Sequence, residues 1–315
     1  MRGPHLDIRK LQYFLEIVEQ GSITRAAESL RVAQPALSLH LKTMEEYLGT
    51  RLLDRSRTGV TPTEAGSLLA KRARAVIDDL TRTEDEVRTL GADPAGEVRI
   101  GLPGTIGDIV ALPLLEAARC GYPRITVNVS EAMSGFVAGW LAEGRVDAAV
   151  LYSSPQDGNL RSRLLLEEEL AVLQAPGSRA PAELSLAELA AVPLILPSKA
   201  HGLRQQADAA FRAAGVAPEV AIEIDSYANI KRLVASGFGA SILPRRAIRQ
   251  EVSQGTLTES RFSAPGLWRG AYLVYPAGKP ATRAQEAVRT LITSVVTELQ
   301  ADGAWPGSRP PPGTG

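Results

Sequence analysis

The sequence is poor in the residues from which disulfides, metal sites and catalytic triads are built. It contains one cysteine, Cys120, so a disulfide and a cysteine-built metal site within the chain are both excluded. Its three histidines, His5, His40 and His201, lie far apart in sequence, which argues against a histidine metal site or a Ser/His/Asp triad. We therefore expect no metal, no cofactor and no enzymatic activity.

Long apolar runs and an excess of charge are also absent. No window approaches the roughly 18 uncharged apolar residues of a membrane span, and the N-terminus lacks an apolar core of signal-peptide length. We expect a cytoplasmic protein without a membrane partner, and a reduced Cys120 fits that compartment. Lys plus Arg and Asp plus Glu both total 35, so any signal for nucleic acid must be local.

The chain has 315 residues, of which 44% are hydrophobic and 22% charged, as in folded proteins of two domains or of three if one is small. Residues 6–61 contain short helical patterns separated by turn residues, and residues 62–90 form one uninterrupted helical pattern. From residue 97 onward, β-rich runs alternate with helical patterns. The tail of residues 301–315 is rich in proline and glycine, so we expect it to be disordered.

Apolar residues at helical spacing predict three helices before residue 50. The first ends at Gly21, Ser22 caps the second, and the third begins at Pro35 and ends at Gly49. The buried faces are, in order, Leu11, Phe14, Leu15 and Val18; Ile23, Ala26, Ala27 and Leu30; and Leu37, Leu41, Met44 and Leu48. A few residues join the second and third helices, the spacing of a helix-turn-helix.

The opposite face of the third helix carries small, short polar and basic side chains and no acidic ones. Ser38 can hydrogen-bond a base edge and Leu39 can pack against a thymine methyl. A turn at Thr58 and Gly59 predicts a small wing with arginines that pair with phosphates. We expect base contacts from Gln34, Pro35, Ser38 and Leu39, and phosphate contacts from Arg31, Lys42, Arg55 and Arg57. The alternative is a small three-helix cap with solvated arginines.

One long helix, about 43 Å in length, is predicted from Pro62 to Leu90. The run Thr61-Pro62-Thr63-Glu64 has the pattern of a capping box with Thr61 as the N-cap. Behind it, apolar residues close to heptad spacing form a narrow stripe that suits a two-helix seam. We expect it to pair two chains through Leu69, Val76, Leu80 and Val87. The alternative is a helix packed along its own domain.

Residues 97–300 alternate strand and helix, which predicts an α/β domain with mostly parallel sheets. Its size suits two lobes around a cleft, lobe I being 97–166 plus 267–300 and lobe II 167–266. The glycines of GLPGTIG do not have the spacing of a phosphate-binding loop. The consecutive acids Glu167, Glu168 and Glu169 alternate along a predicted strand, where a solvated edge explains them.

Strand ends in this domain predict a ligand site, because ligands of α/β sheets bind beyond the carboxyl ends of strands. The helix start at Gly104 and Thr105 suits an anionic or polar group. Ser198 and Lys199 could close on a carboxylate, and a protonated His201 could add charge. The residues we expect at this site are Gly104, Thr105, Tyr152, Ser198, Lys199, His201 and Ser226. A plain helix cap is the alternative for Thr105, and an exposed loop histidine for His201.

The whole chain resembles a LysR-type transcriptional regulator. The resemblance rests on Ser22 through Ala27, QPALS from Gln34, Glu45 with Leu48-Gly49, and TPTEAG from Thr61, and it continues through GLPGTIG and SGFGASILPR. Similarity to the nitrogen-assimilation-control branch rests on GLPGTIGDIVALPLL, DAAVLY and RTGVTPTEAG. One departure is Ala33, which stands where the family often has a Ser or Thr cap, at a cost of about 1 kcal/mol.

The resemblance implies an α/β protein with an N-terminal all-α winged helix-turn-helix domain (6–63), a long linker helix (62–90) and a two-lobed effector domain (97–300) like periplasmic binding proteins. It also implies a homo-oligomer, usually a tetramer, that bends promoter DNA and answers a small organic effector, with RNA polymerase as a further partner. A solute-binding protein and an α/β enzyme are the alternatives. The first leaves residues 6–90 unexplained, and the second lacks a nucleophile–base pair or a metal cluster.

Overall fold

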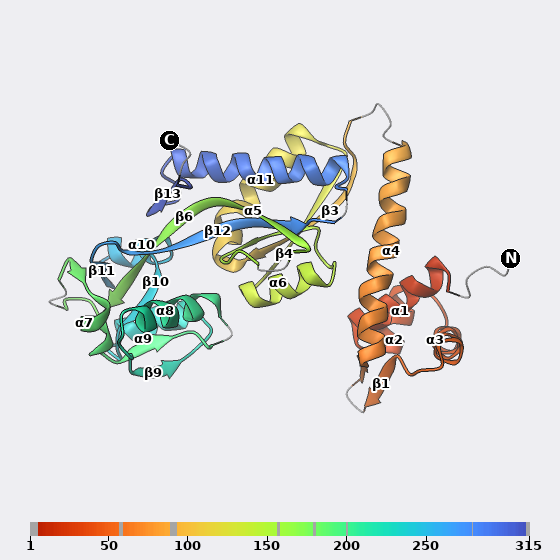
Figure 1. Cartoon of the computed structure of the whole chain (residues 1–315), viewed down its shortest axis with the longest axis horizontal. Coiled ribbons are helices and arrows are strands. Elements are labelled where there is room, and N and C mark those ends of the chain that lie inside the picture. Colours follow the sequence, from red (N-terminus) through yellow and green to blue (C-terminus); the bar gives the residue numbers. More distant parts are fainter. Residues whose placement is uncertain are drawn as a thin grey trace. The chain divides into compact units, whose positions relative to one another are not determined.

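A computed structural model describes residues 6–56, 59–88, 93–155, 158–178, 181–199, 201–278 and 280–312 (Figure 1). The chain divides into two compact units. One comprises residues 1–93 and 142–145, and the other comprises residues 94–141 and 146–315. Among the described residues, no helix has both the length and the apolar character that a bilayer crossing requires.

The first unit consists of helices and one small hairpin. Its elements are α1 (Ile8–Gln20), α2 (Ile23–Ser29), α3 (Gln34–Leu48), β1 (Leu53–Ser56), β2 (Gly59–Pro62) and α4 (Glu64–Arg88). The predicted helix ends are confirmed at Gly21 and Gly49, which have the left-handed backbone of a C-cap, and at Ser22, whose hydroxyl accepts from the Arg25 N–H. Phe14, Ala26 and their neighbours from all three helices form one buried core.

The prediction of the α4 start is wrong by two residues. Thr61 and Pro62 belong to β2, where they pair with Asp54 and Leu53 of β1. The N-cap is Thr63, whose hydroxyl accepts from the Gly66 N–H at 3.0 Å. Of the predicted end of this helix, Leu90 lies outside the described residues.

The second unit contains a mixed sheet in which β4, β3 and β5 are parallel and the long strands β6 and β12 are antiparallel. The expectation of mostly parallel sheets is therefore wrong for the strands that run between the lobes. The elements are β3 (Gly96–Pro103), α5 (Gly104–Gly121), β4 (Ile125–Ala132), α6 (Ser134–Ala142), β5 (Ala148–Leu151), β6 (Leu160–Gln174), β7 (Glu183–Leu184), α7 (Leu186–Ala190), β8 (Leu194–Leu196), α8 (Gly202–Ala213), β9 (Val220–Glu223), α9 (Tyr227–Ala235), β10 (Ser241–Pro244), α10 (Arg245–Ser253), β11 (Thr258–Phe262), β12 (Leu267–Pro276), α11 (Arg283–Ala301) and β13 (Ser308–Arg309).

The strands β6 and β12 connect two separate hydrophobic cores (Figure 1). Leu165 and Leu166 of β6 belong to the core around α5 and α11, which pack against each other. Leu170 through Leu173 of the same strand belong to the core around α8, α9 and α10, where β10 and β11 pair with β6. Two lobes are thus joined by continuous strands.

The prediction of a disordered tail is wrong for residues 301–312, of which Ala301 still belongs to α11. Trp305 is buried, and its indole N–H donates to Glu168 Oε2 at 3.0 Å. Ser308 and Arg309 then pair with β6 opposite Glu168 and Glu167. Proline and glycine content reports the average tendency of a segment, whereas a single buried tryptophan can anchor it.

The solvated-edge interpretation of the three glutamates is also wrong for Glu168 and Glu169, which are buried. Glu168 pairs with the buried Arg269 of β12, and Glu169 pairs with Arg245 and Arg261. Buried carboxylates need such partners, because an unpaired charge inside a protein is costly.

Candidate nucleic-acid interface and ligand cavity

The helix-turn-helix is held together by small residues at the contact between α2 and α3. Ala26 and Ala27 are buried on α2, and Leu37 and Leu41 are buried on α3. Because alanine side chains are short, they let α3 approach α2 closely. This packing fixes which face of α3 is left for a partner.

The free face of α3 presents Gln34, Pro35, Leu39 and Lys42 to solvent, with Ser38 partly buried. Leu39 is 64% exposed, which is high for a leucine. The Gln34 side-chain amide donates to the Ser38 hydroxyl at 2.9 Å, so the two polar groups form one hydrogen-bonding unit. Such a face can contact base edges in a major groove.

The sequence predicted that α3 lacks a side-chain cap, and the structure confirms this. Ala33 is the N-cap, and no side chain bonds to the helix start. Gln34 does not replace it either: no side-chain oxygen accepts from the helix start, and the Gln34 Nε2 donates to the Ser38 hydroxyl. The helix begins at Gln34, one residue before the predicted Pro35. Few N–H groups are left free at this start, because Pro35 has none and the Ala36 N–H donates to the Ala33 carbonyl at 3.0 Å.

The predicted phosphate-binding arginines lie at the turn and on the wing. Arg31 is exposed in the turn between α2 and α3, with a left-handed backbone at φ 54°. Arg55 is exposed on β1, where it pairs with Val60 of β2. Arg57 lies outside the described residues. These positions on exposed elements are compatible with phosphate contacts.

The apolar stripe of α4 has two different environments. Leu69 is half-buried and packs against the core of the first unit. Val76 and Leu80 are exposed, and Val87 is 68% exposed. The distal part of the stripe is thus an apolar surface with no cover from its own unit.

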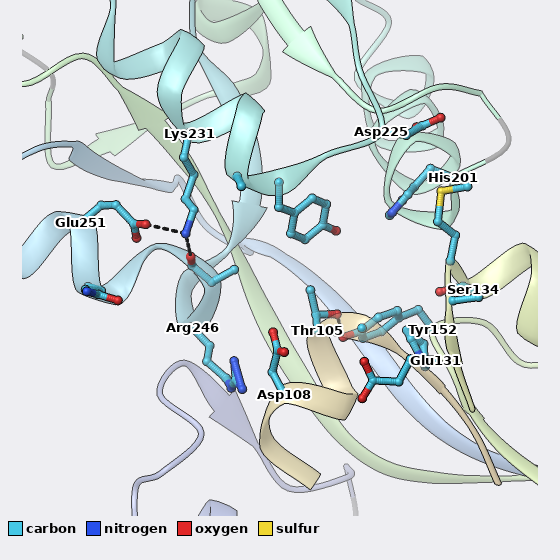
Figure 2. Close-up of a pocket in the computed structure, with 18 residues that line it drawn as sticks. Thr105, Asp108, Glu131, Ser134, Tyr152, His201, Asp225, Lys231, Arg246 and Glu251 are labelled. Carbon is cyan, nitrogen blue, oxygen red and sulfur yellow. Dashed lines mark hydrogen bonds and ion pairs between the residues drawn. The ribbon is translucent and has the colours of Figure 1, made fainter. Parts of the chain in front are cut away.

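The second unit contains a cavity of about 610 Å³ between its lobes (Figure 2). One wall is formed by the start of α5, the end of β4 and Tyr152 after β5, and the other by α9, α10 and the start of α8. Its size lies within the usual range for small-molecule sites. Thr105 and Tyr152 are joined by a hydrogen bond of 2.7 Å between their hydroxyls.

Four of the predicted ligand residues line this cavity together: Gly104, Thr105, Tyr152 and His201. Ser198, Lys199 and Ser226 are not among the lining residues. The backbone N–H of Ser198 donates to the Asp225 carboxylate, the Lys199 carbonyl accepts from Gln205, and the Ser226 hydroxyl caps α9. Thr105 makes no cap hydrogen bond, since α5 has Pro103 at its N-cap.

His201 is neither the exposed loop histidine nor the positive charge that the sequence suggested. Its Nδ1 accepts the Leu203 N–H at 3.2 Å and so caps α8. Burial, and then the positive charge of Arg269, lowers the pKa of His201. The ring is therefore neutral near pH 7, which leaves Nδ1 unprotonated, as its hydrogen bond from the Leu203 N–H requires.

Tyr152, which lines the cavity, stacks on a buried arginine. The Arg269 guanidinium carbon lies 3.5 Å from the centroid of the Tyr152 ring. Burial raises the pKa of Tyr152 and of Tyr227, so both phenols stay protonated. The two Tyr hydroxyls therefore offer neutral donors and acceptors to a ligand.

Sequence reasoning missed all six acidic and basic residues that line the cavity. They are Asp108, Glu131, Asp225, Lys231, Arg246 and Glu251. The rule of strand ends could have found three of them, because Glu131 lies at the end of β4, Asp225 follows β9 and Arg246 follows β10. Asp108 and Lys231 are one turn into helices, where sequence alone does not say which side faces a cavity.

A helix-turn-helix with a polar exposed face, together with an α/β unit that encloses a ligand-sized cavity, defines a DNA-binding regulator with a small-molecule domain. Residues 8–67 match the family described as bacterial regulatory helix-turn-helix protein, lysR family, and residues 91–297 match the LysR substrate binding domain. The chain belongs to the LysR family of transcriptional regulators, with a DNA-binding domain followed by an effector-binding domain.

The chain is similar to curated regulators over nearly its whole length. It is 33% identical over 296 residues to the nitrogen assimilation regulatory protein Nac of Escherichia coli K12, covering 93% of this chain and 96% of that protein. The Nac protein of Klebsiella aerogenes is 32% identical with the same coverage. These similarities support the expected nitrogen-assimilation-control-like branch.

Solved structures show the same fold. Full-length OxyR from Pseudomonas aeruginosa has a TM-score of 0.73 at 24% identity, with 93% of this chain and 95% of that chain covered. CbnR, solved in complex with its target DNA, has a TM-score of 0.53 at 22% identity, with 92% and 100% covered.

Proposed function

We propose that the chain binds promoter DNA through α3 and the wing, and that an effector in the cavity changes this binding or the bending of the promoter. The observation that carries the proposal is the free face of α3. Gln34 and Ser38 form a hydrogen-bonded pair beside an exposed Leu39, and Lys42 extends the face. This combination offers hydrogen bonds to base edges, an apolar contact and a phosphate contact.

The proposal includes self-association through α4. Val76, Leu80 and Val87 leave an apolar stripe exposed, and a second copy of the same helix would cover it. Two recognition helices in one dimer can bind two half-sites on DNA, as two-fold symmetric regulators do. RNA polymerase is the further partner that such a promoter-bound protein would act on, in the cytoplasm.

A gel-shift assay on the DNA upstream of the gene tests this function. Ser38→Ala should change the preference among DNA sequences, because it removes a base-facing hydroxyl and frees the Gln34 amide. Arg55→Ala should weaken binding to all sequences and reduce the slope of log affinity against log salt by about 0.9. Arg212→Ala, an exposed arginine on α8, serves as the control and should leave both quantities unchanged.

Two results would contradict the assignment. Equal proportional losses of specific and nonspecific binding in Ser38→Ala and Arg55→Ala would show that bases and phosphates are not divided between these residues. Equal losses in Arg55→Ala and Arg212→Ala would show that the wing has no particular role in binding DNA.

A further inference from the structure

The charged side chains of the cavity are unbalanced toward the negative. Four carboxylates line it, Asp108, Glu131, Asp225 and Glu251, against two cationic side chains, Lys231 and Arg246. His201 adds no charge near pH 7, because burial lowers its pKa. The Ser198 N–H holds the pKa of Asp225 below its ordinary value, so this carboxylate stays ionised.

The two cations are not equally available to a ligand. Lys231 is paired with Glu251 at 2.5 Å and also donates to the Ala247 carbonyl at 3.1 Å (Figure 2). Its charge is therefore already neutralised by Glu251. Arg246 makes no ion pair within 4.0 Å with any described residue. A carboxylate ligand would therefore find one free cation among several negative groups.

The acids on the wall of α5 and β4 are free. Both side chains are exposed, and neither the Asp108 nor the Glu131 carboxylate has a hydrogen bond or an ion pair with the described part of the chain. The Glu131 carboxylate lies directly over α5, so close that a Cβ on Gly107 would come within 2.0 Å of its Oε1. The first turns of α5, where an anionic ligand was expected, thus already carry the negative charge that a helix start attracts.

The rest of the wall also suits a positive group. The Tyr152 ring stacks on the Arg269 guanidinium, whose charge is paired with Glu168. The Thr105 and Tyr152 hydroxyls lie beside the Asp108 and Glu131 carboxylates in the same cavity (Figure 2). Among the described residues, no group of three or more His, Cys, Asp or Glu side chains could hold a metal ion.

We propose that the effector of this domain is an organic cation with a primary ammonium or guanidinium group, bound between Asp108 and Glu131. This inference rests on the proposed effector role of the cavity and adds the chemical class of the ligand. Charge-assisted hydrogen bonds to the two carboxylates hold the cationic head, and the excess negative charge of the walls attracts it. A carboxylic acid of the same size is disfavoured for the same reason.

Binding to the full-length chain tests the charge preference directly. The probes are 1,4-diaminobutane and agmatine as cations, and succinate as an anion of the same carbon chain length as the diamine. We expect the two amines to raise the thermal unfolding temperature and to give saturable heats in calorimetry. Succinate should do neither at the same concentrations.

Substitutions in the cavity then locate the site. Asp108→Asn and Glu131→Gln preserve shape and remove charge, so each should weaken amine binding roughly tenfold or more. Arg246→Gln removes a like charge from the cavity and should leave amine affinity equal or higher. The control is Glu298→Gln, which removes an exposed carboxylate on α11 outside the cavity and should leave amine affinity unchanged.

The proposal is overturned if no amine binds, if Glu298→Gln weakens amine binding as much as Glu131→Gln, or if succinate binds and loses affinity in Arg246→Gln. A wild-type chain that shifts its upstream DNA but binds no amine would refute the ligand class and leave the regulator intact. Amine binding that depends on Asp108 and Glu131, in a chain that binds no DNA, would refute the proposed function and leave the site intact.

Discussion

The buried pair of Glu168 and Arg269 gives the sharpest prediction about stability. Arg269 is 1% exposed and Glu168 is 3% exposed, and the guanidinium Nε donates to the carboxylate at 2.5 Å. The other guanidinium nitrogens, Nη1 and Nη2, have no acceptor among the described residues. Glu168 also accepts from the indole N–H of Trp305. Glu168→Ala therefore removes the partner of two buried donors at once.

The expected loss is large because a charge is left buried without a partner. Breaking a buried ion pair from one side costs about 3–5 kcal/mol. Total stabilities are about 5–15 kcal/mol, so the change would remove roughly a fifth or more of the total. For a unit of this size the unfolding temperature should fall by roughly 6–20 °C.

Glu167 is a matched control on the same strand. It pairs with Arg309 at 2.7 Å, but the two side chains are 21% and 48% exposed. Solvent screens such a pair, so Glu167→Ala should cost about 0–1 kcal/mol. The double variant Glu168→Leu with Arg269→Met removes both charges and should recover most of the stability lost in Glu168→Ala.

Urea unfolding followed by tryptophan fluorescence measures these differences. Trp140, Trp268 and Trp305 are the three tryptophans of the chain, and all lie in the second unit, so the signal reports on that unit. If Glu168→Ala unfolds within about 1 kcal/mol of Glu167→Ala, the argument from burial is refuted.

Three further predictions follow from the same contacts. Leu80→Asp should reduce the molar mass in light scattering because it puts a charge on the exposed stripe of α4, whereas Thr81→Asp, off the stripe, should not; equal masses would place the interface elsewhere. As pH falls from 8 through 6.5, the ordinary pKa of histidine, the free energy of unfolding in urea should fall more for the wild type than for His201→Asn. The reason is that the pKa of His201 is lowered in the folded chain, so the unfolded chain binds more protons in this range. Equal slopes of unfolding free energy against pH in the two proteins would contradict this. Gly66→Ala should lower the thermal stability of the helix-turn-helix by roughly 1–3 kcal/mol, because its Cβ would lie 1.9 Å from the Leu52 carbonyl oxygen, whereas Gly139→Ala, in open space on α6, should not.

The sequence by itself determined the elements of the first unit and their order. Local signals sufficed there, because the Ser22 cap, the Gly21 and Gly49 ends and the helical spacing of apolar residues act within a few residues of one another. The same signals failed at the start of α4. Thr61 and Thr63 can both cap a helix, and only the pairing of β1 with β2 selects Thr63.

Part of the cavity was predictable for a similar reason. A strand followed by a helix start places its end residues at one edge of a sheet, which is how Gly104 and Thr105 could be predicted from their positions. The charge of the cavity was not predictable, because it depends on which lobe II residues come to face Asp108 and Glu131. Arg246 follows a strand far along the chain, and Lys231 is neutralised only by the folded neighbour Glu251.

The tail and the three glutamates show what only tertiary structure decides. Glu167, Glu168 and Glu169 are identical in type and adjacent in sequence, yet one is paired near solvent and two are buried. Their partners Arg309, Arg269 and Arg245 lie 76 to 142 residues away along the chain. Local sequence determines which backbone conformations are favourable, whereas the burial of a charge depends on distant segments that fold against it, and so it appears only in the assembled structure.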